Sequence, residues 1–138
     1  MKLTKLNSKK IVYVNLDKYK VDWERKVSNP QFICKQFLKD YWLNDVVFEE
    51  ACIPGSKYRI DLWNETKSLI VEVSPESVHI KYNTFIHKNR SGFYKKLTSD
   101  VEKEDWANEN GYKYISLNDK DIKNLSRKYV YEKFGINL

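Results

Sequence analysis

The stretch KYRIDLWNETKSLIVEVSPE, from Lys57 to Glu76, decides the fold that this sequence predicts. Its two apolar runs, YRIDLW and SLIVEV, are rich in Tyr, Ile, Leu, Val and Trp, the residue types that favour β-strands. The polar segment NETK lies between them and is typical of a tight turn. The stretch is therefore predicted to be a β-hairpin in the middle of the chain.

The expected register of this hairpin places two acidic side chains together. We expect the turn to pair Asn64 with Lys67. Asp61 then lies opposite Ile70, and Glu72 is its diagonal neighbour on the same face, roughly 7 to 8 Å away at Cα. Two carboxylates at that spacing predict a site for a divalent cation.

Helix and strand signals precede the hairpin. Asp17 is a helix-capping residue and predicts a helix over residues 17–27, which Asn29-Pro30 ends. Over residues 31–43 apolar side chains cover more than half of the helix circumference, which predicts a buried helix. The run VVFEEACIP, residues 46–54, is predicted to be the first central strand, because a Pro-Gly pair ends it.

The segments after the hairpin complete the order helix, three strands, helix, strand. A helix is expected over residues 93–110, ended by Gly111, and the run YKYISL, residues 112–117, follows as the last strand. The closing segment, 118–138, is expected to form one or two short helices with an Asn or Asp cap. This order predicts an α/β protein.

Length and composition are those of one globular domain. The 138 residues suffice for a single core, placed at about 17–117, after a basic arm over residues 1–10 and a short edge strand, IVYVN. A charged fraction of 32% and a mean hydropathy of −0.69 argue against a membrane protein. No signal-peptide core follows Met1, so we expect the cytoplasm, which is the host cytoplasm if a phage encodes the chain.

Two further features concern cysteine and charge. Cys34 and Cys52 have no second Cys or His at metal spacing, so both are expected to be reduced core thiols. The formal charge of +6 and a pI near 9.1 favour an anionic partner, of which nucleic acid is the commonest, although a basic protein without such a partner is the alternative. The sequence is compatible with either oligomeric state, a homodimer or a monomer.

At the hairpin the chain resembles the PD-(D/E)XK nuclease superfamily, through the pattern RID, ten residues, IVEVS. The resemblance implies a restriction-endonuclease-like core, a central mixed β-sheet flanked by helices. It also implies that Asp61 and Glu72 hold Mg²⁺ or Mn²⁺ and that a Lys two residues after Glu72 completes the site. This sequence departs from the pattern there, because Ser74 occupies the Lys position.

Upstream, the segment from WERKVS to KYRID resembles the entry segment of the superfamily, in which a Glu on the first helix supplies a further acid. The matching residue is Glu24, 37 positions before Asp61. Three carboxylates would suit Mg²⁺ or Mn²⁺ rather than Zn²⁺. An exposed helical Glu is the alternative for Glu24, and Glu49 and Glu50 compete for the same role.

Downstream, FYKKLTSDVEKEDWANENGYKYISL resembles phage-type and very-short-patch-type endonucleases, with Asp100 and Lys103 matching an acid and a cation of that pattern. A helical wheel predicts a core stripe of Phe93, Tyr94, Leu97 and Val101. The flank beside this stripe could reach the acidic face of the hairpin, although a solvated helix face is an equal alternative. This flank consists of Lys96, Asp100 and Lys103.

The loop over residues 79–96 combines cations and aromatic residues without a single acid. That mixture is typical of segments that contact phosphates and stack on bases, although charge runs are usually solvated. We predict that this loop grips nucleic acid. The predicted contact residues are Lys81, His87, Lys88, Arg90 and Lys95.

The resemblance implies metal-assisted phosphodiester hydrolysis, with catalytic residues drawn from Glu24, Asp61, Glu72, Lys96 and Lys103. In place of the missing lysine the candidates are Lys96, Lys103 and Lys81, in that order. The first hypothesis is a metal-dependent DNA endonuclease of phage or mobile-element type, with DNA favoured over RNA. The alternative is a nuclease-fold protein that has lost catalysis and binds nucleic acid or a protein partner.

Overall fold

The computed structural model describes residues 1–74 and 90–138, with side chains from residue 98 onward in the second part. Its centre is a four-stranded sheet in the order β3-β4-β5-β6, with bounds Val47–Cys52, Arg59–Asn64, Leu69–Val73 and Lys113–Leu117. The pairs β3-β4 and β4-β5 are antiparallel, and β5-β6 is parallel. The predicted α/β class, the central hairpin and the last strand are confirmed.

The hairpin turn is two residues longer than predicted. Asn64 pairs with Leu69 and not with Lys67, because its side-chain oxygen accepts the Lys67 N–H at 2.8 Å and caps a wider turn. Ser68 closes this turn with a φ of +52°. The shift is an even number of residues, so every side chain stays on the predicted face.

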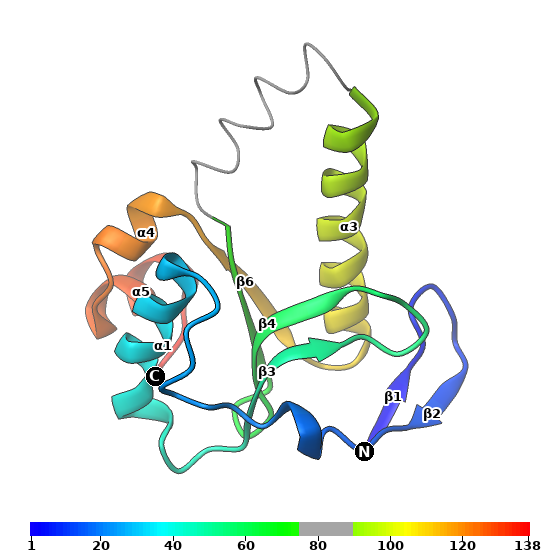
Figure 1. Cartoon of the computed structure of the whole chain (residues 1–138), viewed down its shortest axis with the longest axis horizontal. Coiled ribbons are helices and arrows are strands. Elements are labelled where there is room, and N and C mark those ends of the chain that lie inside the picture. The colour runs from blue at the N-terminus through cyan, green and yellow to red at the C-terminus, as the bar shows by residue number, and fades with distance from the viewer. Residues whose placement is uncertain (75–89) are drawn as a thin grey trace.

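Helices cover both faces of the sheet. Figure 1 shows α1 (Asn29–Trp42), α4 (Asp119–Lys123) and α5 (Arg127–Phe134) on one side and α3 (Arg90–Glu109) on the other. Ser28 caps α1 by accepting the Gln31 N–H, and proline in the first turn suits that helix start. The predicted helices over 31–43, 93–110 and the closing segment are therefore confirmed.

The core beneath α3 is aromatic. The Trp63 ring packs edge-on against Trp106 and Tyr112, with centroids 5.5 and 5.3 Å away. The predicted core stripe on this helix is wrong where it can be checked, because Val101 is 57% exposed while Trp106 is 1% exposed. Phe93, Tyr94 and Leu97 belong to the same predicted stripe, and their side chains lie outside the described part.

The first residues are not a loose arm. Strand β1 (Lys2–Thr4) pairs antiparallel with β2 (Ile11–Tyr13), the strand expected from IVYVN. Leu3 is buried in the core beneath α3. The basic segment is therefore an ordered two-stranded ribbon, and the prediction of an arm over residues 1–10 is wrong because one apolar side chain anchors it.

The predicted helix over residues 17–27 is also wrong. Only a short 3₁₀ turn, η1 (Asp17–Tyr19), forms, and Lys20 then bridges to Phe48 of β3. The physical reason is a competing set of hydrogen bonds. The buried Lys35 ammonium donates to the carbonyl oxygens of Asp22 and Arg25, at 2.5 and 2.8 Å, and so engages backbone groups that a helix would use.

The closing helices have clear termini. Asn118 and Asp121 form a reciprocal capping box at the start of α4, and Gly135 ends α5 with a φ of +68°. Cys34 and Cys52 are free thiols; Cys34 is buried in the core as predicted, whereas Cys52 is half-buried. Within the described residues, no helix is long and apolar enough to cross a bilayer.

Candidate functional site

Two carboxylates face each other on the α3 side of the sheet. Extending the β4-β5 register by one pair sets Asp61 opposite Glu72, in place of the diagonal relation predicted. One Asp61 oxygen, Oδ2, accepts the Val73 N–H at 2.9 Å, which fixes that side chain against β5. Glu72 is only 6% exposed.

The electrostatics of this pair favour a bound proton or cation. Burial raises the pKa of Glu72 well above its ordinary value of 4.5, and the charge and hydrogen bonding of Asp61 raise it further. The Lys103 ammonium acts in the opposite direction on the same pKa. Two carboxylates so close cannot both stay charged without compensation, so a positive species between them is favoured.

Lys103 is the described lysine that α3 directs at the pair. Its Nζ lies 3.4 Å from Glu72 Oε1, and its side chain is 12% exposed. It reaches the sheet because Lys103, Trp106 and Ala107 follow the helical spacing and share the inward face. Lys103 belongs to the helix flank that was predicted to reach the acidic face of the hairpin, and it does contact that face at Glu72.

Lys96 and Lys81 cannot be placed at the site. The Lys96 backbone belongs to α3, but its side chain lies outside the described residues, as does all of Lys81. Ser74 continues β5 beside β6, with its N–H donating to Leu117 O at 2.7 Å. Its half-buried side chain follows Glu72 by two residues and so keeps to the acidic face.

Sequence reasoning missed Tyr114. This residue of β6 pairs with Ile70 of β5. Burial raises the pKa of Tyr114, and the negative charges of four nearby acids raise it further: Glu72, Asp100, Asp61 and Glu104. A phenol among these acids stays protonated and can donate a hydrogen bond. Alternation in YKYISL, combined with a parallel β5-β6 pairing, was the signal that could have found it.

Glu24 does not join the pair. It lies in a turn, is exposed, and pairs with Lys39 Nζ at 2.7 Å. In the part of the chain that the structure describes, no group of three or more His, Cys, Asp or Glu could hold a metal ion. The three-carboxylate site expected from the resemblance is therefore not formed by the described residues.

The two competitors of Glu24 have other partners. Glu49 faces α1 and forms a buried ion pair with Lys35, at 3.0 Å. Glu50 falls opposite Asp61 when the β3-β4 register is extended, but its Oε1 accepts the Gln31 amide N–H at 3.1 Å. Its φ of +52° bends the strand at this position.

The predicted grip loop lies almost entirely outside the described residues. Lys81, His87 and Lys88 fall within residues 75–89. Arg90 and Lys95 belong to the first turns of α3, of which the backbone alone is described. The prediction that these residues contact nucleic acid stays a prediction.

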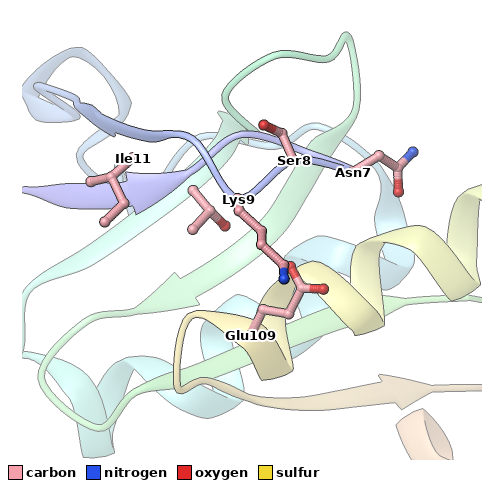
Figure 2. A pocket seen from close by; sticks show the side chains of 6 residues that line it. Asn7, Ser8, Lys9, Ile11 and Glu109 are labelled. Carbon is pink, nitrogen blue, oxygen red and sulfur yellow. The ribbon is translucent and has the colours of Figure 1, made fainter.

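A pocket of about 520 Å³ lies away from the acidic pair. It opens between the β1-β2 ribbon and the end of α3, and Figure 2 shows Lys9 and Glu109 pointing toward each other across it. Neither Asp61 nor Glu72 lines it. Comparison of the chain with family models, with curated proteins and with solved structures found no match.

The donor set suits a hard divalent cation. Mg²⁺ takes oxygen ligands, usually one or two carboxylates, and completes its shell with water and substrate phosphate. Asp61 and Glu72 supply two such carboxylates, and the Val73 N–H fixes Asp61 through Oδ2. Both ligands are carboxylate oxygens, which suit Mg²⁺ or Mn²⁺ better than Zn²⁺.

Proposed function

We propose that the chain is a metal-dependent nuclease that hydrolyses phosphodiester bonds in DNA. The observation that supports this best is the placement of Lys103 at the pair formed by Asp61 and Glu72. A lysine beside two metal-binding carboxylates is the combination that the superfamily resemblance implies. Here the lysine comes from α3 and not from the strand.

The order of elements adds support. Helix α1, strands β3 to β5, helix α3 and strand β6 follow one another in the chain, with β6 parallel to β5. This is the order that the resemblance implies for a restriction-endonuclease-like core. In this order, α3 lies over the face of the sheet from which Asp61 of β4 and Glu72 of β5 project, and it carries the third proposed site residue, Lys103.

Each residue has a role that its position allows. Asp61 and Glu72, with the backbone carbonyl of Val73, would hold Mg²⁺ or Mn²⁺. A bound ion supplies polarisation of the scissile phosphate and a lower pKa for the attacking water. Lys103 brings an ammonium to the edge of the pair, where it can donate to a phosphate oxygen or orient a water. It supplies the charge that Ser74 lacks.

The alternative is a nuclease-fold protein that binds nucleic acid without cutting it. One observation favours it: the Lys103 ammonium already compensates part of the Glu72 charge in the metal-free protein. Under this alternative Lys103 competes with the cation. The two functions therefore make opposite predictions for removal of the ammonium.

The test is plasmid nicking in Mg²⁺, Mn²⁺ or EDTA with the variant Lys103→Met. If Lys103 acts on the phosphate or water, the rate should fall roughly 10²- to 10⁴-fold, because that is the usual contribution of a positioned acid, base or cation. Affinity for Mn²⁺, measured by calorimetry, should be retained or increase. Lys120→Met is the matched control, since Lys120 is exposed on α4.

Three results separate the alternatives. Asp61→Ala should abolish Mn²⁺ binding while far-UV circular dichroism stays native, and unchanged Mn²⁺ affinity would refute the site. Full nicking activity in Lys103→Met would remove that residue from the mechanism. A wild type that binds but does not nick, and that gains nicking on Ser74→Lys, would establish the binding protein.

A further inference from the structure

The first twenty residues have a net charge almost as large as that of the whole chain. They contain six lysines and one acid, Asp17, which is a net charge of +5 in a chain whose formal total is +6. Among the described residues, none of the ion pairs involves a lysine of this segment. These lysines therefore add their charge to the surface, where Lys9 points toward Glu109 across the pocket of Figure 2.

The segment is held rigidly by the rest of the domain. Thr4 O accepts the Trp106 indole N–H at 2.7 Å, and the Thr4 N–H donates to Asn110 Oδ1 at 3.0 Å. Beyond β1, the Leu6 N–H donates to Pro54 O at 2.9 Å in the β3-β4 turn. The ribbon is thus an attached element with fixed lysine positions.

Close packing at this turn requires glycine. Gly55 has a φ of +78°, and a Cβ there would lie 3.1 Å from the Lys5 Cβ. A side chain at this position would be strained and would push the ribbon away. The turn and the ribbon are consequently one continuous surface.

The outer side of the ribbon combines cations with exposed apolar groups. Tyr13 is 76% exposed, Ile11 is exposed beside it, and Lys2 Nζ lies 5.6 Å from the centre of the Tyr13 ring. Lys9 and Lys10 are exposed at the tip. Amines that bind phosphates and an aromatic ring that packs on sugars or bases are the usual components of a nucleic-acid surface.

We propose that this basic ribbon binds the phosphate backbone of a duplex nucleic acid. A two-stranded ribbon matches the width of the major groove, which is about 12 Å. Exposed Lys57, just before β4, and exposed Arg59, the first residue of β4, continue the charge toward Asp61, so a duplex held by the ribbon would extend toward the acidic pair. The inference deepens the proposed function, on which its choice of partner rests, by naming the duplex as substrate and this ribbon as its support.

The experiment measures binding without cleavage. A fluorescently labelled duplex is titrated in EDTA at several salt concentrations, using the wild type, Lys9→Gln/Lys10→Gln and a control of equal net charge, Lys120→Gln/Lys123→Gln on α4. The ribbon variant should lower the slope of log affinity against log salt by up to about 1.8, since each lost phosphate contact removes about 0.9. The control should keep the wild-type slope.

Each outcome bears on the inference. Equal slopes for the ribbon variant and the control would overturn it, as would tighter binding of a single strand than of the duplex. Binding of the wild type to anionic vesicles without binding to the duplex would also overturn it. If Asp61→Ala keeps duplex binding while losing Mn²⁺, and the ribbon variant does the reverse, both proposals are supported. If the slopes are equal but nicking persists, the ribbon inference fails while the proposed function stands.

Discussion

Glu72 is the residue at which the requirements of folding and of chemistry conflict. A buried carboxylate costs free energy unless it is compensated, and Asp61 opposite it increases that cost. A cation site needs two such carboxylates together. Lys103 relieves part of the conflict in the metal-free protein by lying 3.4 Å from Glu72.

The raised pKa of Glu72 predicts how stability depends on pH. In the unfolded chain this group titrates near 4.5, whereas in the folded protein its pKa is higher. Between the two values the folded state binds more protons, so the free energy of unfolding should fall as pH rises through this window. Glu72→Gln should remove that slope and stabilise the metal-free protein above the window.

Urea unfolding in EDTA at about pH 5 and about pH 8 checks this prediction. Glu132→Gln is the control, because Glu132 lies exposed on α5 and pairs weakly with Lys128 at 3.9 Å. A wild-type protein whose stability keeps rising across the window would contradict the assignment of a raised pKa to Glu72.

At the residue scale the sequence predicted the acids better than the cation. Asp61 and Glu72 followed from strand alternation, which survives an even shift in register. For the cation the sequence left Lys96, Lys103 and Lys81 open, because Val101, which was expected on the core stripe of α3, does not mark the face that meets the sheet. The inward face carries Lys103 and Trp106, and Val101 points to solvent.

Helix α3 is the element that connects the acidic pair to the ribbon. Its inward face contacts Glu72 through Lys103, packs on Trp63 through Trp106, and holds β1 through the Trp106 indole N–H. One helix therefore fixes the position of both proposed surfaces. Displacement of this helix would affect cation binding and duplex binding together.

Trp106→Ala tests this connection. The substitution should cost about 3 to 5 kcal/mol of unfolding free energy, as expected for removing a buried Trp side chain. Val101→Ala on the same helix should cost little, since Val101 is exposed. Urea denaturation followed by circular dichroism gives both values, and similar costs for the two variants would mean that α3 packs on the sheet by a different face.

Element types were predictable where local signals and tertiary contacts agree. The hairpin, α1 and β6 have strong patterns, and Ser28 caps α1 as the sequence suggests. The helix expected over residues 17–27 failed because a long-range contact, the Lys35 ammonium on the Asp22 and Arg25 carbonyls, outweighs local propensity. No periodicity within that segment records such a partner.

At the scale of the whole molecule, the ion pair of Lys35 and Glu49 joins three segments. Lys35 comes from α1, Glu49 from β3, and the carbonyls of Asp22 and Arg25 from the entry segment. This ammonium donates to two backbone carbonyls and to the buried Glu49 carboxylate. Removing Lys35 leaves the buried Glu49 with Arg25 Nε, 3.5 Å away, as its remaining cation, and removing Glu49 leaves the buried ammonium with carbonyl partners alone.

Lys35→Met should therefore destabilise the protein by about 3 to 5 kcal/mol, and Glu49→Leu should do likewise. The double variant should recover much of that loss, because two apolar side chains of similar size replace both charges. A double-mutant cycle in urea measures the coupling. Additive costs would show that the ion pair is not a coupled unit.

The spacing of the site residues along the chain has a consequence for the order of folding. Asp61 and Glu72 are brought together by the local closure of one hairpin, whereas Lys103 arrives from a helix 31 residues beyond Glu72. Local contacts form faster than distant ones because they close shorter loops. The repulsion is therefore created early and relieved late, so a divalent ion or a proton that neutralises the pair would speed folding as well as stabilise the product.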